Sequence, residues 1–196
     1  METLLTIDKE TFLWLNGWVG QYAWVDSIAE VIISDYLVPV VMGLTLLGLW
    51  FVGKTEEQRT NNQLAVLNTL ASVVLSGLLV ELSNYFFYRP RPFENYSVAL
   101  LFYRPVDSSF PSNPAVVGAA VAMSVFFWNR RIGTVLAIVA FIYSLSRLYG
   151  GVCYPLDILG GLVIGSGVSF VTWAIILYVG FIPRSILRFA RALYLA

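Results

Sequence analysis

Long apolar runs separated by short polar stretches dominate this sequence, and they restrict its fold more than any other feature. Of the 196 residues, 58% are hydrophobic and only 12% are charged. A run that crosses about 30 Å of hydrocarbon must satisfy its backbone polar groups internally, which a helix does within one segment. We therefore expect an all-α integral membrane protein. The candidate spans are residues 36–52, 63–87, 113–128, 133–149 and 158–179.

The segments at the two ends of the chain are amphipathic. Residues 7–19 mix charged residues with large apolar ones, which favours a helix lying in the membrane interface. The expected organisation is an interfacial segment at 1–34, a transmembrane domain at 35–180 and an amphipathic basic tail at 181–196. The first thirty residues lack the basic start, apolar core and cleavage site of a signal peptide, so we expect them to be retained.

The last predicted span begins with closely spaced glycines. They lie at Gly160, Gly161, Gly165 and Gly167. Small residues let two membrane helices approach closely, so this face is predicted to be a packing surface and not a binding site.

Composition excludes several classes of function. The chain has no histidine, which removes the commonest general acid and metal ligand, and its single cysteine, Cys153, has no partner for an intrachain disulfide. Lys+Arg and Asp+Glu balance at 12 each, with no basic block or zinc-ligand spacing. We expect no nucleic-acid partner, no metal and no cofactor.

Polar segments stand at the ends of the predicted spans on one side of the membrane. They are residues 84–92 (NYFFYRPRP), 109–115 (SFPSNPA) and 146–157 (SRLYGGVCYPLD). An arginine this close to hydrocarbon is costly unless it faces a polar cavity or an anion, so Arg147 marks a candidate site. The connection 88–112, rich in proline and arginine, is too irregular for a helix, and loops of this length are often functional.

These segments resemble the signature of the type 2 phosphatidic acid phosphatase (PAP2) superfamily, Lys-x6-Arg-Pro, Pro-Ser-Gly-His and Ser-Arg-x5-His-x3-Asp. They are most similar to those of small bacterial undecaprenyl pyrophosphate phosphatases. The resemblance extends over roughly residues 5–180 in order, spacing and helix topology. It implies a PAP2-like helical bundle and, in the family, hydrolysis of lipid phosphates or diphosphates through a histidine nucleophile.

Some signature positions keep the family residue. The resemblance implies that Arg91, Ser112 and Arg147 hold phosphate oxygens and that Asp157 is the aspartate that orients the nucleophile. The residues also allow simpler roles. The arginines could form ion pairs with Glu94 or Asp157, and Ser112 could only cap a helix.

The other signature positions depart from the family. Asn84 stands in place of the lysine, Pro114 in place of the acid histidine and Cys153 in place of the nucleophilic histidine. Proline cannot exchange a proton, so residue 114 has no acid role. Asn113 and Pro114 are nevertheless a favourable helix start, and the free amides of the next turn, 115–117, would suit an anion. Asn84 is interpreted as a satisfied interhelical amide.

Cys153 has a catalytic and a structural interpretation. A thiolate is a competent phosphoryl acceptor, and Arg147 would lower the pKa of a nearby thiol. Asp157 would oppose that shift, and a lone cysteine in an apolar chain is commonly a packing residue. The packing interpretation is favoured.

The sequence therefore predicts a catalytically impaired family member, a pseudophosphatase. It would bind a lipid or polyprenyl phosphate headgroup without hydrolysing it, or serve as a structural subunit beside a membrane-protein partner, its pocket vestigial. The alternative is an active lipid phosphatase or diphosphatase in which Cys153 is the nucleophile and Asp157 assists.

The distribution of basic residues predicts the orientation. Of the 12 basic residues, most lie on the side opposite the motifs: Lys54, Arg59, Arg130, Arg131, Arg184, Arg188 and Arg191. Positive-inside bias then places the motifs outside the cytoplasm of a multi-pass cell-membrane protein. A membrane-impermeant thiol reagent should label a cysteine introduced at Ser108 from outside intact cells. Labelling from the cytoplasmic side alone would contradict this orientation.

Overall fold

The computed structural model of the chain describes residues 2–192, and every regular element in that range is a helix. The helices are α1 Glu2–Asn16, α2 Ala23–Ile33, α3 Leu37–Phe51, α4 Glu56–Phe86, α5 Pro92–Asn95, α6 Asn113–Phe126, α7 Arg130–Tyr149, α8 Pro155–Val179 and α9 Phe181–Ala192. The all-α prediction is confirmed. Residues 193–196 of the predicted tail lie outside the described residues.

The predicted spans correspond to α3, α4, α6, α7 and α8. By length and composition, α4, α7 and α8 are each long and apolar enough to cross a membrane. The pair α2 and α3, bent by 50° at residues 34–36, would make a fourth span if taken together. With 15 and 14 residues, α3 and α6 are short for a full crossing by themselves.

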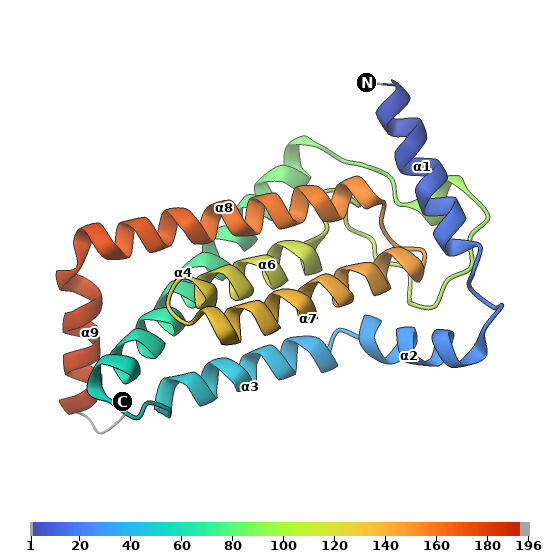
Figure 1. Cartoon of the computed structure of the whole chain (residues 1–196). Helices are drawn as coiled ribbons and strands as arrows, with labels where there is room; N and C mark the ends of the chain where they lie inside the picture. The colour runs from blue at the N-terminus through green and yellow to red at the C-terminus, as the bar shows by residue number, and fades with distance from the viewer. Residues whose placement is uncertain (1, 193–196) are drawn as a thin grey trace.

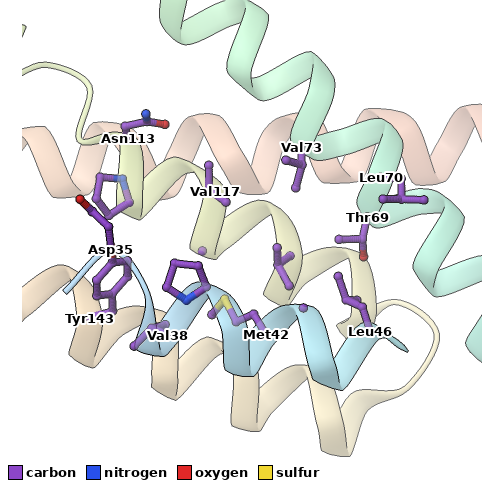
Figure 2. A pocket seen from close by; sticks show the side chains of 15 residues that line it. Asp35, Val38, Met42, Leu46, Thr69, Leu70, Val73, Asn113, Val117 and Tyr143 are labelled. Carbon is purple, nitrogen blue, oxygen red and sulfur yellow. The ribbon is translucent and has the colours of Figure 1, made fainter. Parts of the chain in front are cut away.

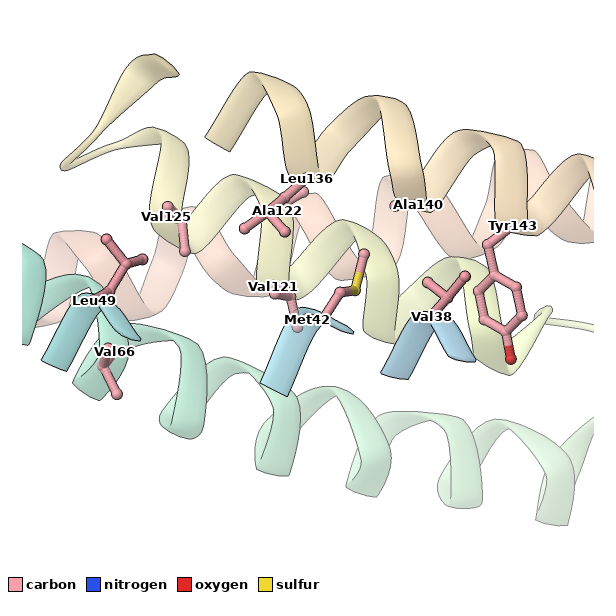
Figure 3. Close-up of a cluster of buried hydrophobic side chains, with 10 residues drawn as sticks. All are labelled: Val38, Met42, Leu49, Val66, Val121, Ala122, Val125, Leu136, Ala140 and Tyr143. Atoms are coloured by element: carbon pink, nitrogen blue, oxygen red, sulfur yellow. The ribbon is translucent and has the colours of Figure 1, made fainter. Parts of the chain in front are cut away.

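Helix α6 is the centre of the bundle (Figure 1). It packs against α8, α7 and α4, while α3 covers α4 and α7. Figure 3 shows the apolar cluster that results, in which Val121 and Val125 of α6 lie among Met42, Leu136 and other buried side chains. Because α6 is enclosed by other helices, a short helix there leaves little backbone exposed to lipid.

Small residues bring α6 and α8 into close contact, as the glycine-rich face predicts. A Cβ built on Gly165 would lie 2.2 Å from the carbonyl oxygen of Val116 and 3.0 Å from the Cβ of Ala119. At Gly167 an added Cβ would meet no atom within 4 Å. The close contact therefore involves Gly165 and does not extend to Gly167.

The motif segments gather at one end of the bundle. In Figure 1 the connection between α5 and α6, the α7–α8 turn and α1 lie at this end, and α9 lies at the other. In the connection, Ser108 is only 3% exposed, whereas Val106 is 96% exposed, so Val106 is the better position for a labelling cysteine.

Replacing Gly165 and Gly167 in turn by alanine tests the α6–α8 contact. In both variants the loss of a helical glycine raises the free energy of unfolding by about 0.5–1 kcal/mol. Gly165→Ala also inserts a methyl group against backbone, and overpacking of this kind lowers the free energy of unfolding by about 1–3 kcal/mol. Thermal unfolding in detergent should show a lower midpoint for Gly165→Ala than for Gly167→Ala. Equal midpoints would contradict the close packing described above.

Candidate functional site

A polar pocket of about 110 Å³ lies at the motif end of the bundle. Its walls include signature residues from all of the motif segments: Arg91, Ser112, Pro114, Arg147 and Cys153. The sequence prediction that these segments converge is therefore confirmed by the geometry. Of the signature positions, all of which are described, Asn84 and Asp157 lie outside this lining.

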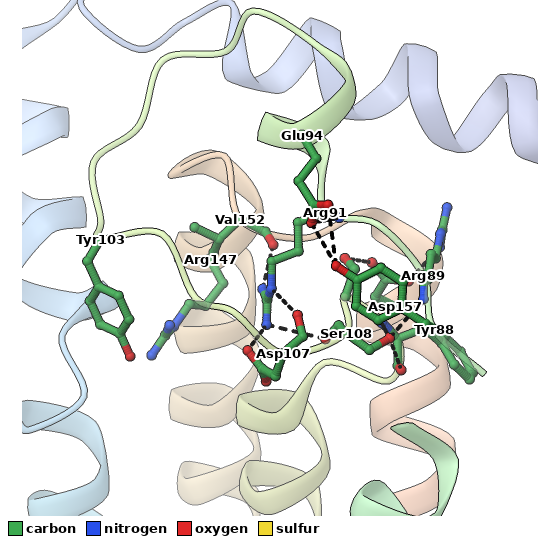
Figure 4. A network of polar contacts seen from close by, with 12 residues as sticks. Tyr88, Arg89, Arg91, Glu94, Tyr103, Asp107, Ser108, Arg147, Val152 and Asp157 are labelled. Carbon is green, nitrogen blue, oxygen red and sulfur yellow. Dashed lines mark hydrogen bonds and ion pairs between the residues drawn. The ribbon is translucent and has the colours of Figure 1, made fainter. Parts of the chain in front are cut away.

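Arg91 is buried, and its guanidinium donates both to the connection that follows it and to the α7–α8 turn (Figure 4). Its Nη2 donates to Oδ1 of Asp107 at 2.8 Å, its Nε to the Asp107 carbonyl oxygen at 2.9 Å, and its Nη1 to the carbonyl oxygen of Val152 at 2.7 Å. Glu94, which the sequence suggested as an ion-pair partner, instead accepts the backbone N–H of Arg91 at 2.9 Å. The charge partner of Arg91 is Asp107.

Arg147 is also buried, and its charge partner comes from a distant segment. Its Nη2 donates to the carboxylate of Asp35 and, at 2.9 Å, to the hydroxyl of Tyr143, and the guanidinium lies 4.1 Å from the centre of the Phe102 ring. Asp157, the partner suggested by the sequence, is engaged elsewhere. The buried Nε of Arg147 has no hydrogen-bond partner among the described residues. Leaving such a donor unsatisfied costs about 1–3 kcal/mol, so an acceptor that reached this atom would be bound favourably.

The pocket is therefore lined by charges that balance. Arg91 and Arg147 face Asp107 and Asp35, and both carboxylate side chains are 44% exposed. An ion pair with one partner that remains accessible to solvent can be exchanged for another anion more readily than a fully buried pair.

Cys153 lines this pocket and also packs against an apolar cluster. It is 1% exposed and belongs to a buried cluster that includes Ala115 and Leu148. Burial raises the pKa of the Cys153 thiol to about 12, and the charge of Asp157 adds to the rise, against the opposing effect of the pocket arginines and a hydrogen bond with Ser112. The thiol is therefore protonated at pH 7. These properties favour the packing interpretation.

The start of α6 differs from the sequence prediction by one residue. Ser112, not Asn113, is the N-cap, and its side chain makes no capping hydrogen bond. The backbone N–H of Val116 donates to the Ser112 carbonyl oxygen at 3.0 Å, so it is not free for an anion as the sequence suggested. Pro114 then stands at the second helical position, still in the first turn, where a backbone N–H would have no partner within the helix.

The interpretation of Asn84 as a satisfied interhelical amide is wrong for one of its atoms. Its side-chain Oδ1 is buried without a hydrogen-bond partner among the described residues. The residue lies near the end of α4, away from the pocket lining. Asn84 is therefore not placed to contact a ligand in the polar pocket.

Asp157 is completely buried and belongs to a separate network (Figure 4). Its carboxylate accepts from Nη1 of Arg89 at 2.5 Å, from the hydroxyl of Ser109 at 2.5 Å and from the backbone N–H of Tyr154 at 2.9 Å. Nη2 of Arg89 donates to Asp8 at 2.5 Å. The aspartate that would orient a histidine nucleophile is thus held by an arginine and links α8 to α1.

Sequence reasoning missed the acidic partners of the site and Arg89. A weak signal for Asp35 exists, because it is an acidic residue at the start of an apolar run, where a charge needs a partner. Arg89 stands between the first signature position and Arg91, but nothing in the sequence indicates that it pairs with Asp8 and Asp157.

Comparison with known proteins places these features in context. The family model described as PAP2 superfamily matches residues 65–181. The undecaprenyl-diphosphatase BcrC of Bacillus subtilis is 32% identical over 164 residues, covering 84% of this chain and 81% of that protein.

Solved structures give the same fold. The crystal structure of Aquifex aeolicus LpxE has a TM-score of 0.65 at 24% identity and covers 86% of this chain and 95% of that one. The PAP2-type phosphatidylglycerolphosphate phosphatase of Bacillus subtilis has a TM-score of 0.64 at 19% identity, covering 89% and 87%.

The environment of Cys153 predicts low reactivity. Iodoacetamide at pH 7 should leave Cys153 unmodified in the folded protein and modify it after denaturation, because the thiol is buried and protonated. The reference is a cysteine introduced at the exposed Val106, and mass spectrometry measures both sites in the same molecule. Modification of the two cysteines at similar rates in the folded state would show that Cys153 is accessible and ionised.

Proposed function

Since the chain belongs to the PAP2 superfamily, we propose that it binds the phosphate of a membrane lipid in its polar pocket without hydrolysing it. The observation that carries this proposal is the composition of the pocket. Arg91 and Arg147, the cationic residues of the signature, line it, while the positions of the acid and the nucleophile hold Pro114 and a buried Cys153.

The pocket retains what anion binding requires. Arg147 has a buried Nε without an acceptor, and a charge-assisted hydrogen bond to phosphate would satisfy it. A volume of about 110 Å³ corresponds to about four water molecules. That size suits a single phosphate group better than a sugar-bearing headgroup. The relative named undecaprenyl-diphosphatase suggests a polyprenyl phosphate or diphosphate as the ligand class.

The pocket lacks what turnover requires. Phosphoryl transfer needs an in-line nucleophile, and general acid help is typically worth about 10²- to 10⁴-fold. Pro114 has no proton to give, and the Cys153 thiol, with a pKa of about 12, is protonated at neutral pH. Asp157 is occupied by Arg89 and Ser109, so its carboxylate is not free to assist Cys153.

The alternative is an active lipid phosphatase or diphosphatase with Cys153 as nucleophile. The diphosphatase relative favours it, because a phosphate leaving group is stable and depends less on a general acid. It would require the ligand itself to expose the thiol and lower its pKa. A third role is that of a structural subunit beside a membrane-protein partner, with the pocket vestigial.

The orientation of the site is part of the proposal. The excess of basic residues on the α9 side supports a motif end that faces outside the cytoplasm of a bacterial cell membrane. In that position the pocket would receive lipid phosphates from the outer leaflet.

Binding is tested by native mass spectrometry with a polyprenyl monophosphate. The double variant Arg91→Ala and Arg147→Ala should lose at least about tenfold in affinity, because hydrogen bonds to charged groups are worth about 1.5–3 kcal/mol each. The matched control is Arg104→Ala, which removes a cation from the same connection without touching the pocket lining. Unchanged binding by the double variant would exclude this pocket as the binding site.

Turnover is tested with a polyprenyl diphosphate and a phosphate-release assay. The parent chain and Cys153→Ser should both stay at background. Histidine at positions 114 and 153 with lysine at 84 should raise the rate if these positions alone block chemistry. A clear rate in the parent that disappears in Cys153→Ser would establish the cysteine phosphatase instead.

A further inference from the structure

A second cavity, of about 350 Å³, adjoins the polar pocket (Figure 2). It lies between α3, α4 and α6, and apolar side chains such as Met42, Leu46, Val73 and Val117 line most of it. We refer to this cavity as the apolar groove. It is partly open, and a hydrocarbon chain is the occupant that its apolar lining favours within a bilayer.

The apolar groove and the polar pocket share part of their walls. Asp35, Asn113 and Pro114 line both cavities. In Figure 2, Asp35 and Asn113 lie at one end of the groove, and Leu46, Thr69 and Leu70 lie toward the other. A lipid with its chain in the groove would therefore have its headgroup beside Asp35.

Asp35 stands at this junction because the chain breaks there. It lies between α2 and α3, where the two helices meet at 50°. Its carboxylate accepts from Nη2 of Arg147 and, at 2.9 Å, from the hydroxyl of Tyr103 in the long connection. Three segments distant in sequence are joined through this one carboxylate.

We propose that Asp35 is a displaceable carboxylate between the groove and the pocket: the phosphate of an entering lipid takes Arg147 over from Asp35, while the lipid's hydrocarbon chain remains in the groove. This inference rests on the proposed function and adds the route of the ligand and the residue that controls its entry. The ligand class is a lipid monophosphate, of either the polyprenyl or the diacyl type.

The exchange is favourable because of how Arg147 is bound. Nε and Nη2 form one edge of the guanidinium fork, and a phosphate can accept from both at once. Asp35 is bonded only at Nη2, and Nε has no partner among the described residues. A phosphate therefore gains a hydrogen bond that Asp35 does not make.

In this proposal Asp35 opposes phosphate binding until its carboxylate moves away from Arg147. A phosphate on Arg147 would lie beside the carboxylate, and like charges in contact repel each other strongly. Displaced from Arg147, the 44% exposed Asp35 side chain has access to water. Removing its charge should therefore tighten binding, whereas loss of an ordinary phosphate ligand would weaken it.

Two glycines of α3 allow the groove to be blocked with a matched control. Gly43 lines the groove, and a Cβ added there would meet no atom within 4 Å. Gly48 is equally open but is not part of the groove lining. Phenylalanine at either position adds the same bulk to the same helix, and only Gly43→Phe occupies the groove.

The experiment measures binding of a long-chain polyprenyl monophosphate, geranyl monophosphate and phosphatidate by native mass spectrometry. Asp35→Asn should tighten binding of every probe that the parent binds by about tenfold. Asp26→Asn, on α2 and bonded to Gly20 and Tyr149, is the control and should change nothing. Tyr103→Phe, at an exposed position, removes only the second contact of Asp35 and should tighten binding to a smaller extent.

Gly43→Phe should bind the long-chain probe or phosphatidate several-fold more weakly, with geranyl monophosphate unaffected and Gly48→Phe equal to the parent. The probe that responds identifies the chain type. Weaker or equal binding by both Asp35→Asn and Tyr103→Phe would overturn the role of Asp35, and a Gly43→Phe variant equal to the parent would overturn the groove. If the parent, Asp35→Asn and Tyr103→Phe all failed to bind any probe, the proposed function itself would be wrong. Binding seen only in Asp35→Asn or Tyr103→Phe would support displacement of the Asp35 carboxylate by the ligand.

Discussion

The structure of the motif end depends on the pairing of buried and half-buried arginines with carboxylates. A guanidinium in or beside hydrocarbon is tolerated only when its charge is matched and its donors are used. Each arginine takes its partner from a different part of the chain: Arg89 from Asp8 and Asp157, Arg91 from Asp107, and Arg147 from Asp35. The Arg89 pairs join α1 and the long connection to α8, and the Arg147 pair joins the α2–α3 break to α7. The Arg91 pair ties two parts of the long connection to each other. The charges that the proposed function assigns to ligand binding are thus the same charges that hold this end of the bundle together.

Much of this arrangement could be predicted from the sequence, and the remainder could not for a definite physical reason. Apolar runs define helices, and helix order alone brings the ends of α4 and α7 to the starts of α6 and α8. The ion-pair partner of each arginine could not be predicted in the same way. Asp35 and Arg147 are 112 residues apart, and Asp8 and Arg89 are 81 apart. Nothing local selects these pairs over Glu94 or Asp157, because the choice depends on how whole helices pack.

The residue at signature position 153 affects the packing and hydrogen bonding around it. With a cysteine at position 153, the space near Asp157 is filled by an apolar cluster, and the carboxylate is bonded by Arg89, Ser109 and the Tyr154 amide. Such a carboxylate supports the turn that carries Cys153. Gly151, with φ of 86° and the Ala99 carbonyl oxygen 2.8 Å from where its Cβ would lie, fixes the same turn from the other side. The turn that carries Cys153 is therefore held by close packing and by a hydrogen bond to Asp157.

The close contact between α6 and α8 determines which side of the pocket is able to move. Ser112 and Pro114 stand at the start of α6, and the α6 backbone at Val116 meets α8 at Gly165 with no room for a methyl group. Sliding of these helices past one another would force atoms into overlap, so this wall is rigid. The opposite wall consists of a bend between short helices and a connection without regular structure. The pocket thus combines one fixed wall with one compliant wall, so ligands of unequal size would be accommodated by displacement of the α2–α3 side alone.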